Sequence, residues 1–462
     1  MPFGDLSYGS GATSTILHPL VAVAMLIAIA LMFLLPRKYL IVLFLCMVLL
    51  VPLGQQLYVA GVHLYVYRII ILFGWVRMVG TGLTSKGGLF KGRYNSVDTV
   101  FILWTGFHVM SSLLLFKSGA ALIYQAGFVW SAMGGYFLLR CLIQDDEDIH
   151  RAIKTFAVIA AIVALAMINE KLTMRNVFGL LGGVRLVPDV REGTIRANGP
   201  FQHAILAGSF GGTLLPLVYW LWKSREAKKI AVAGIIASTI IVYCAGSSTP
   251  LLAYAAGVFA PCLWPLRKRM RTIRWGIVLM LVGLQMVMKA DVWWLIARVD
   301  VIGASSGYHR AKLVDVCIRH FRDWWLIGTD QMASWGWEMW DLSNQFVNEA
   351  ETGGLAVLVC FIAIISICYG RLGKARKSVE GDRKQEWFMW ALGAALFAHI
   401  AAFFGVNYWD QMHFAWLALL AIVSAATASR ITKRVKEPEV ELMEPPLAYA
   451  SPSGPDRSAF HY

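Results

Sequence analysis

The chain has 462 residues, of which 58% are hydrophobic and only 15% are charged. This composition leaves too little polar surface to cover a soluble globule of that size, so it argues against a soluble enzyme. The 42 Lys and Arg residues exceed the 28 Asp and Glu residues and give a net charge of +14, which in so apolar a chain bears on membrane orientation and requires no nucleic-acid partner. Of the seven cysteines only Cys317 lies away from the apolar runs, and since no disulfide or metal-ligand spacing is readable, we expect no metal and no cofactor.

Long apolar runs follow one another along the chain, each ended by charged residues. A hydrocarbon core of about 30 Å needs helices of about 20 residues to cross it. The pattern therefore predicts an all-α polytopic membrane protein, a bundle of about 12–13 transmembrane helices within residues 1–428, with a large loop on the outer side. The expected spans are 16–35, 39–56, 62–79, 98–116, 120–142, 152–168, 203–222, 229–245, 249–266, 274–290, 352–370, 386–404 and 411–428.

The span 62–79 is the least regular, because Arg68 lies inside it. A charge within a span is tolerated when it snorkels to the membrane surface or faces a polar cavity. This segment is therefore either a true span or a re-entrant loop.

The short connections alternate in charge, and this alternation predicts the orientation. Those assigned to the cytoplasm hold clusters of Lys and Arg, whereas the alternate short connections hold essentially Lys117 alone. The N-terminus is then outside and the C-terminus inside, and the polar tail 429–462 is predicted to be disordered and cytoplasmic. The basic clusters lie at 37–38, 86–93, 223–229, 267–271 and 374–384.

Two connections, 169–202 and 291–351, are too long to be turns, and both fall on the outer side. Long ordered connections usually carry function. The second contains seven tryptophans among scattered charges, a composition typical of segments that lie in the headgroup region. We therefore expect it to pack on the outer membrane surface.

The first outer loop contains Arg196, just before a turn at Gly199 and Pro200 that leads into a span. Glycine lets the backbone approach a ligand closely, and a guanidinium donates two parallel hydrogen bonds to a phosphate. The N-terminus of the following helix adds positive potential. Arg196 is a candidate phosphate ligand; the alternative is an arginine that binds lipid headgroups or caps carbonyl groups.

The second outer loop holds His309 and Arg310 at the start of a helix-like stretch and ends in the polar segment 341–353. Its two glutamates, Glu349 and Glu351, are candidate ligand-binding groups, and the alternative is that they merely stabilise a helix N-terminus. If the segment is helical, its acceptors and amides share one face. These residues are Asp341, Asn344, Asn348 and Glu351.

Several short strings occur in a fixed order between about residues 190 and 415. They are Arg196-Ala-Asn-Gly-Pro-Phe201 opening a span, Gly246-Ser-Ser-Thr-Pro250 at a short outer turn, an Arg310-led helix ending in a turn at Gly328, Asn344 followed by Glu351-Thr-Gly353, and Tyr408-Trp-Asp-Gln411. In their order and common outer location they resemble the O-antigen ligase and polymerase superfamily, most closely its exopolysaccharide members.

The resemblance implies an enzyme, a metal-independent glycosyltransferase at the periplasmic face of the bacterial inner membrane. Such enzymes polymerise or ligate saccharide repeat units in O-antigen or exopolysaccharide synthesis. The donor is a glycan linked to undecaprenyl pyrophosphate, and the acceptor is a saccharide or a glycolipid. Membrane lipid and polysaccharide-assembly proteins are further candidate partners.

The resemblance also implies roles for individual residues. Arg196 and Arg310 match the family's two arginine positions and would stabilise the charge of the leaving pyrophosphate. The candidate substrate-binding residues are Arg68, Asn344, His309, Glu351 and Gly199.

The acceptor hydroxyl needs a general base, and here the sequence departs from the family pattern. The ligases have a histidine about ten residues before the Glu-Thr-Gly ending, where this chain has Asp341, Leu342 and Ser343. We expect Asp341 to accept the proton. The alternatives are histidines that enter the site from elsewhere, namely His309, His320 and His413. The missing histidine weakens the ligase interpretation more than the polymerase interpretation.

A transporter or a lipid-linked oligosaccharide flippase would be equally apolar. Such a protein should instead show ionisable residues or broken helix pairs near the middle of the bilayer. Charge in this chain is concentrated at the outer face, which favours an enzyme acting there. A non-catalytic assembly subunit is a third alternative, which the missing histidine keeps open.

Overall fold

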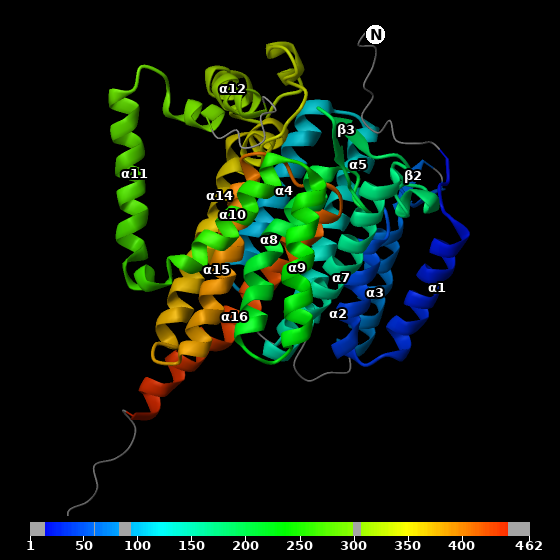
Figure 1. Cartoon of the computed structure of the whole chain (residues 1–462), viewed down its shortest axis with the longest axis horizontal. Helices are drawn as coiled ribbons and strands as arrows, with labels where there is room; N and C mark the ends of the chain where they lie inside the picture. The colour runs from blue at the N-terminus through cyan, green and yellow to red at the C-terminus, as the bar shows by residue number, and fades with distance from the viewer. Residues whose placement is uncertain (1–13, 60, 83–93, 299–305, 442–462) are drawn as a thin grey trace, which may run out of the picture.

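The computed structural model describes residues 14–59, 61–82, 94–298 and 306–441. These residues form an almost entirely helical bundle with two short β-hairpins (Figure 1). Nine helices among them are long and apolar enough to cross a membrane. The predicted fold class, a helical bundle of a multi-pass membrane protein, is confirmed to that extent.

The elements follow the order of the predicted spans. The first half of the chain forms α1 (Pro19–Leu34), α2 (Arg37–Leu50), α3 (Val66–Gly82), α4 (Ser96–Phe116), α5 (Gly119–Val129), α6 (Gly135–Leu142), α7 (Asp146–Thr173), α8 (Ala204–Lys223) and α9 (Lys228–Ala245). The second half forms α10 (Ser248–Cys262), α11 (Met270–Val287), α12 (Ser306–Arg319), α13 (Phe321–Trp324), α14 (Gln345–Ser378), α15 (Arg383–Phe403) and α16 (Asp410–Glu441).

Short elements join these helices. The antiparallel hairpins are β1 (Gln56–Val59) with β2 (Val62–Tyr65), and β3 (Asp189–Arg191) with β4 (Thr194–Arg196). A π-helical turn, η1 (Trp130–Gly134), connects α5 to α6. The 3-10 turns are η2 (Phe178–Leu181), η3 (Trp264–Arg269), η4 (Val292–Arg298) and η5 (Met332–Trp335).

A helix coincides with each of the thirteen predicted spans. However, α1, α2, α3 and α10 have only 16, 14, 17 and 15 residues. Each is shorter than the nine candidate spans, which have at least 18 residues; α5, η1 and α6 together form one of these, Gly119–Leu142. The nine longer helices are therefore established as candidate spans, and the total of about thirteen stays a prediction.

The predicted span 62–79 was wrong at its start, because residues 62–65 form strand β2. This strand pairs with β1 from Gln56 opposite Tyr65 to Val59 opposite Val62. Gly61 has φ of 82°, a conformation that glycine adopts without strain in the turn between the strands. Helix α3 begins only at Val66, so Arg68 lies in its first turn, beside the hairpin.

Ion pairs join the connections that the charge pattern assigns to the cytoplasm. They link the α8–α9 connection, η3, and the ends of α7, α15 and α16 at one end of the bundle, which we term the basic face. The pairs are Lys384–Glu226, Arg267–Glu386 and Arg430–Asp146, each at 2.9 Å.

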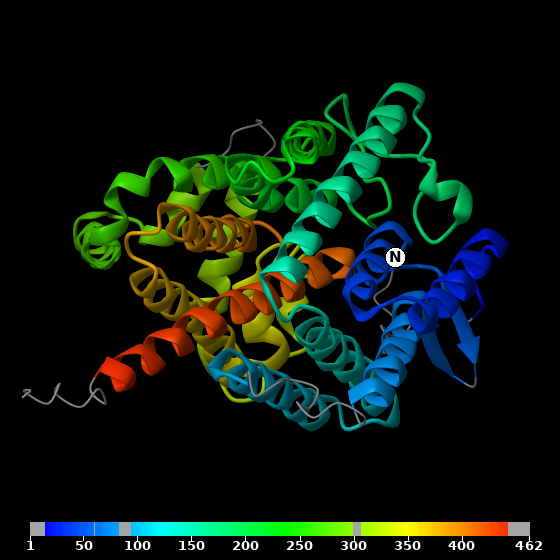
Figure 2. The same cartoon turned by 90° about the horizontal axis from the view of Figure 1, so that it is seen from below.

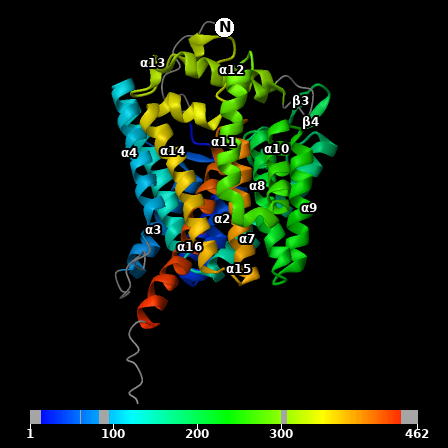
Figure 3. The same ribbon diagram turned by 90° about the vertical axis from the view of Figure 1, so that its left-hand side faces the viewer.

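Both hairpins and the described parts of 169–202 and 291–351 lie at the other end of the bundle, which we term the loop face (Figures 1 and 3). The described connections divide between the two faces as the predicted alternation requires, and the basic cluster at 86–93 lies outside the described residues. The compartment that each face meets stays a prediction.

Helix α16 runs through the middle of the bundle, with α1–α3 on one side and α9–α11 on the other (Figure 2). It contacts α2, α6, α7, α8, α14 and α15. The helix continues to Glu441, well past residue 428, although disorder was predicted from residue 429. Residues 442–462 of that tail lie outside the described residues.

The second long loop has a small core of its own, and its packing on the outer membrane surface stays a prediction. Its apolar side chains bury one another and pack on the start of α14, while Trp337 and Trp340 stay exposed. The core consists of Leu313, Val316, Cys317, Trp324, Met332 and Met339 with Val347 and Ala350 of α14. The preceding helix α11 stands apart from the bundle in Figure 1 and contains no buried residue.

Candidate functional site

Arg196 ends strand β4 at the loop face and turns into the bundle, where only 8% of the residue is exposed. Its guanidinium makes no hydrogen bond or ion pair with any described residue, and its buried Nε has no acceptor. Burial and the neighbouring Arg191 lower the pKa of Arg196, while Asp189, opposite it in the hairpin, acts in the other direction. A buried cation without a counter-ion is costly, so this position suits a bound anion.

The turn after Arg196 is fixed to distant parts of the chain. The N–H of Ala197 donates to the carbonyl of Cys244 at 3.1 Å. The N–H of Gln202 donates to Oδ2 of Asp410 at 2.6 Å, and Nε2 of Gln411 donates to the carbonyl of Pro200 at 2.7 Å. These bonds hold the turn against α9 and the start of α16, so the side chain of Arg196 projects from a fixed backbone.

The segment that holds this turn also bonds to the start of α14. The N–H of Tyr408 donates to Oε1 of Gln345 at 2.5 Å, and Nδ2 of Asn407 lies 3.2 Å from Oδ1 of Asn348. Residues 196–203, 344–349 and 407–411 therefore meet at the loop face, and we call them the three-segment junction. They include two of the strings that carried the family resemblance, 196–201 and 408–411, and Asn344 of a third.

Gly199 lies in this turn with φ of 56°. Its N–H donates to Oε2 of Glu170 at 2.9 Å, and its carbonyl accepts from Nδ2 of Asn176 at 2.7 Å. Both backbone groups are therefore used inside the fold, whereas the sequence suggested a backbone that approaches a ligand.

Asn344 is the N-cap of α14, with Oδ1 accepting from the N–H of Phe346 at 2.9 Å and of Val347 at 3.2 Å. Its Nδ2 is buried without an acceptor among the described residues. Because α14 starts only at Gln345, Asp341 is not helical. The expectation that Asp341 shares a helical face with Asn344 was wrong.

Glu351 and Glu349 lie on α14 in different surroundings. Glu349 is buried and accepts from Nε1 of Trp104 at 2.7 Å, so it is more than an N-terminal charge. Glu351 is half-buried, and its backbone carbonyl accepts from the N–H of Thr329 at 2.8 Å.

His309 and Asp341 lie beside each other, although 32 residues separate them. The Nε2 of His309 is 3.1 Å from the backbone carbonyl of Asp341 and 4.0 Å from its Oδ2. The His309 side chain is 17% exposed and that of Asp341 is 55% exposed. Arg310 follows in the same turn of α12 and is buried.

The other two histidines considered as the general base, His320 and His413, contact other residues than His309 and Asp341. His320 stacks on Trp335 and lies 2.8 Å from Asp323. His413 packs edge-on against Phe414 in α16.

His203, the N-cap of α8, connects the two outer loops electrostatically. Its Nδ1 accepts from the N–H of Ile205 at 3.2 Å. Burial and Arg196 lower the pKa of His203, whereas Asp189 and Asp341 raise it. The charges of Arg196 and Asp341 thus both act on His203, in opposite directions.

Arg68 lies at the β1–β2 hairpin. Its Nη1 donates to the carbonyl of His63 at 2.8 Å, and its Nε donates to Oγ of Ser131 at 3.2 Å. The guanidinium also stacks over Tyr65, with 5.0 Å to the ring centroid, and a side chain at Gly127 would collide with it. Arg68 has no carboxylate partner among the described residues and stays a candidate ligand for an anion.

Four helices begin at the loop face near the three-segment junction, namely α8, α10, α14 and α16. Helix α8 contacts both α10 and α16, and α14 contacts α16. Helix N-termini carry partial positive charge and bind anions. Their grouping adds to the positive potential around Arg196.

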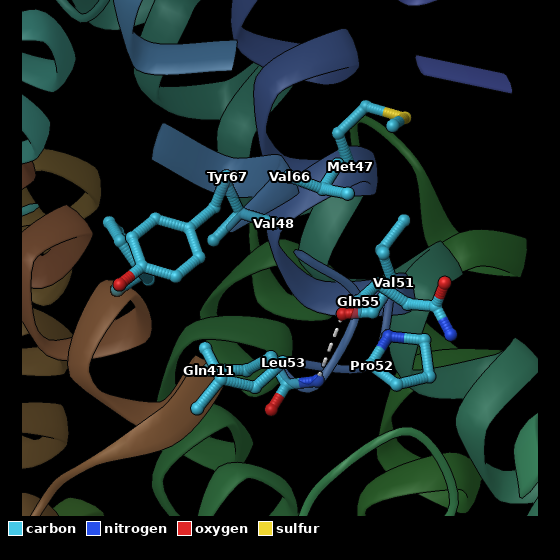
Figure 4. A pocket seen from close by; sticks show the side chains of 10 residues that line it. Met47, Val48, Val51, Pro52, Leu53, Gln55, Val66, Tyr67 and Gln411 are labelled. Atoms are coloured by element: carbon cyan, nitrogen blue, oxygen red, sulfur yellow. Dashed lines mark hydrogen bonds between the residues drawn. The ribbon is translucent and has the colours of Figure 1, made fainter. Parts of the chain in front are cut away.

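A small cavity lies beside the junction, between α2, the turn after it, the start of α3 and the start of α16 (Figure 4). The dashed bond in the figure joins Nε2 of Gln411 to the carbonyl of Val51 at 3.2 Å. The cavity holds about 10 Å³, room for about one water molecule, and none of the predicted site residues lines it. It is too small for a sugar or a pyrophosphate and is not the candidate site.

Sequence reasoning did not assign Asp410, Gln202 or His203 to the site. Asp410 is buried, has φ of 62°, and leaves Oδ1 without a donor among the described residues. The signal for it in the sequence was the Tyr408-Trp-Asp-Gln411 string, which indicated the family resemblance but no role for Asp410. Nothing in the sequence places it against Gln202, which is 208 residues away.

Comparison with known protein families finds no family model that matches the chain, and no curated protein matches it. Function must therefore be argued from the site alone.

Proposed function

We propose that this protein is a glycosyltransferase that takes a glycan from a polyprenyl pyrophosphate, of the undecaprenyl type, and passes it to a saccharide or glycolipid acceptor at the loop face. In this reaction the acceptor oxygen bonds to the anomeric carbon and the bond from that carbon to the pyrophosphate breaks. The pyrophosphate leaves with an added negative charge, and the acceptor proton passes to a base. The loop face is then the periplasmic side of a bacterial inner membrane.

The observation that carries the proposal is Arg196, which is 8% exposed, has a buried Nε, and makes no side-chain hydrogen bond or ion pair with the described residues. A fixed cation in a dry site stabilises charge that develops on a leaving group, since no solvent has to reorganise. Arg310, buried near the start of α12, is the second candidate for this role.

The contact between His309 and Asp341 favours His309 as the general base. A carbonyl oxygen only accepts hydrogen bonds, so the contact of 3.1 Å with Asp341 fixes the proton of a neutral His309 on Nε2. Nδ1 then carries the lone pair that accepts a proton. In the proposed reaction His309 is the base and Asp341 orients it, because the Asp341 carboxylate is itself more than half exposed.

The transporter alternative has less support. Inside the bundle the buried Arg140 pairs with Asp98 at 2.9 Å. Glu349 likewise accepts from Trp104 and from Gln345. Such satisfied pairs are typical of structural contacts within a bundle, whereas a transport path needs groups that exchange partners.

Deletion of the gene followed by sizing of cell-surface polysaccharide tests the proposal. Chains reduced to one repeat unit indicate a polymerase, and a full-length polymer that is not attached indicates a ligase. The absence of any outward-facing lipid-linked unit would indicate a flippase, and an unchanged polysaccharide would contradict the proposal. Complementation with the Arg196→Gln variant should fail although the protein accumulates in the membrane.

A further inference from the structure

We infer that Glu170 is a positioning residue for Arg196, holding the backbone turn from which the arginine projects. This inference rests on the proposed function of Arg196. Glu170 lies in the last turn of α7, is fully buried, and is 26 residues from Arg196 in the sequence.

The carboxylate of Glu170 binds two consecutive backbone N–H groups. Asn198 donates to both carboxylate oxygens at 3.2 Å, and Gly199 donates to Oε2 at 2.9 Å. These residues are the second and third after Arg196. The positive φ of Gly199, 56°, belongs to the turn in which both N–H groups meet one carboxylate.

The location of Glu170 is unfavourable for a carboxylate unless the turn supplies its partners. A negative charge near a helix C-terminus is repelled by the helix dipole, and Glu170 forms no ion pair among the described residues. The backbone donors of Asn198 and Gly199 are its hydrogen-bonding partners. An apolar side chain here would be easier to bury but would leave both N–H groups without acceptors.

The remaining contacts of the turn come from other elements, so Glu170 is one of several fixed supports. Asn176 donates to the carbonyl of Gly199, and Asp410 accepts from Gln202. Glu170 is the support that accepts from the backbone N–H groups of both Asn198 and Gly199. Loss of its bonds should release residues 198 and 199 while the support at Asp410 remains.

The test combines hydrogen exchange with glycan transfer, using the full-length protein in detergent and in liposomes. Glu170→Gln removes one acceptor oxygen and faces an amide donor towards the turn, and Glu170→Asp keeps the charge but shortens the reach. Glu226→Gln is the control, since Glu226 pairs with Lys384 at the basic face. Transfer is followed with a radiolabelled undecaprenyl-pyrophosphate-linked repeat unit, so that low residual activity is measurable.

We expect faster exchange of the Asn198 and Gly199 amides in both Glu170 variants and no change in the control. Glu170→Gln should lower kcat by roughly 10²-fold, the size of effect that a displacement of about 1 Å has on a catalytic group, with little change in KM for the donor. In the Arg196→Gln background the same substitution should lower transfer by less than about 2-fold, because its effect passes through Arg196.

Unchanged exchange at residues 198 and 199 in both variants would overturn the positioning role, whatever the activity. An equal loss of transfer with and without Arg196 would also overturn it, because Glu170 would then act through another group. Full transfer by Arg196→Gln would instead refute the proposed function of Arg196, while the exchange result would still report on the turn. The two failures are therefore distinguishable.

Discussion

Gly328 packs directly against the backbone of Glu351, so that a Cβ on Gly328 would lie 2.1 Å from the Glu351 carbonyl oxygen. The same oxygen accepts the N–H of Thr329 at 2.8 Å, and Gly328 has φ of 82°. This contact attaches the small core of the second long loop to the start of α14. The main chain of Glu351 makes this contact, and the role of its carboxylate in substrate binding stays a prediction.

We expect Gly328→Ala to destabilise the protein by at least about 1–2 kcal/mol, because alanine is strained at positive φ and its methyl group would collide with Glu351. Thermal unfolding in detergent measures the loss. The control is Gly373→Ala in α14, where an added Cβ meets nothing within 4 Å and helix propensity favours alanine by up to about 1 kcal/mol. Equal melting temperatures for the two variants would contradict the contact.

Arg196→Lys should reduce glycan transfer by about 10-fold or more, corresponding to at least ~1.4 kcal/mol of transition-state stabilisation. An ammonium is a point charge and cannot donate the two parallel hydrogen bonds that a guanidinium offers to a pyrophosphate. Initial rates with purified protein measure the change. Arg185→Lys is the control, because Arg185 is an exposed neighbour that pairs with Asp189. A variant at position 196 as active as this control would argue against the anion site.

His309→Gln should lower transfer by about 10²-fold or more, since the amide still donates to the Asp341 carbonyl but has no basic nitrogen. Asp341→Asn should cost less than about 10-fold, because the main-chain contact with His309 remains. The pH dependence of kcat in both variants provides the measurement. The reverse order of effects would assign the base to Asp341, as the sequence alone suggested.

The stability of the protein should fall as the pH drops below about 6.5, partly through His203. Burial lowers the pKa of His203 in the folded state, so the unfolded chain binds a proton first as the pH falls. The contribution of neutral His203 is therefore complete above the unfolded pKa and is lost as the pH falls towards the folded pKa. Protonation also removes the Nδ1 acceptor that caps α8.

His203→Asn tests this dependence, since asparagine is a good N-cap that does not titrate. Melting temperatures at pH 7.5 and pH 5.5 should differ less for this variant than for the wild-type protein. An identical difference in both proteins would show that other groups cause the acid sensitivity.

Residues 190 and 380 should react with a membrane-impermeant thiol reagent from opposite sides of the membrane. Val190 is exposed in β3 at the loop face, and Glu380 lies at the basic face, where it pairs with Lys268 at 2.6 Å. Single-cysteine variants at these positions, in a background lacking all seven native cysteines, should be labelled in intact spheroplasts at 190 only. Labelling at 380 only would invert the predicted orientation and place the loop face in the cytoplasm.

The sequence by itself determined the helical membrane bundle, the helices at all thirteen predicted positions and the division of the connections between two faces. These features follow from local properties, since apolar length selects the helices and the positions of Lys and Arg mark alternate connections. The start of α3 was predicted wrongly, because residues 62–65 are apolar enough for a span but pair with β1 as a strand. Pairing depends on a partner segment, which a hydropathy pattern does not contain.

Only the tertiary structure decided how the candidate site is built. The sequence identified Arg196, but its burial without a partner depends on contacts of its turn with Glu170 and Asp410. The sequence placed Asp341 one helical turn before Asn344, whereas the chain there is not helical and Asp341 instead meets His309. Such contacts join residues tens to hundreds of positions apart. Their identity is set by side-chain packing in three dimensions and not by spacing along the chain.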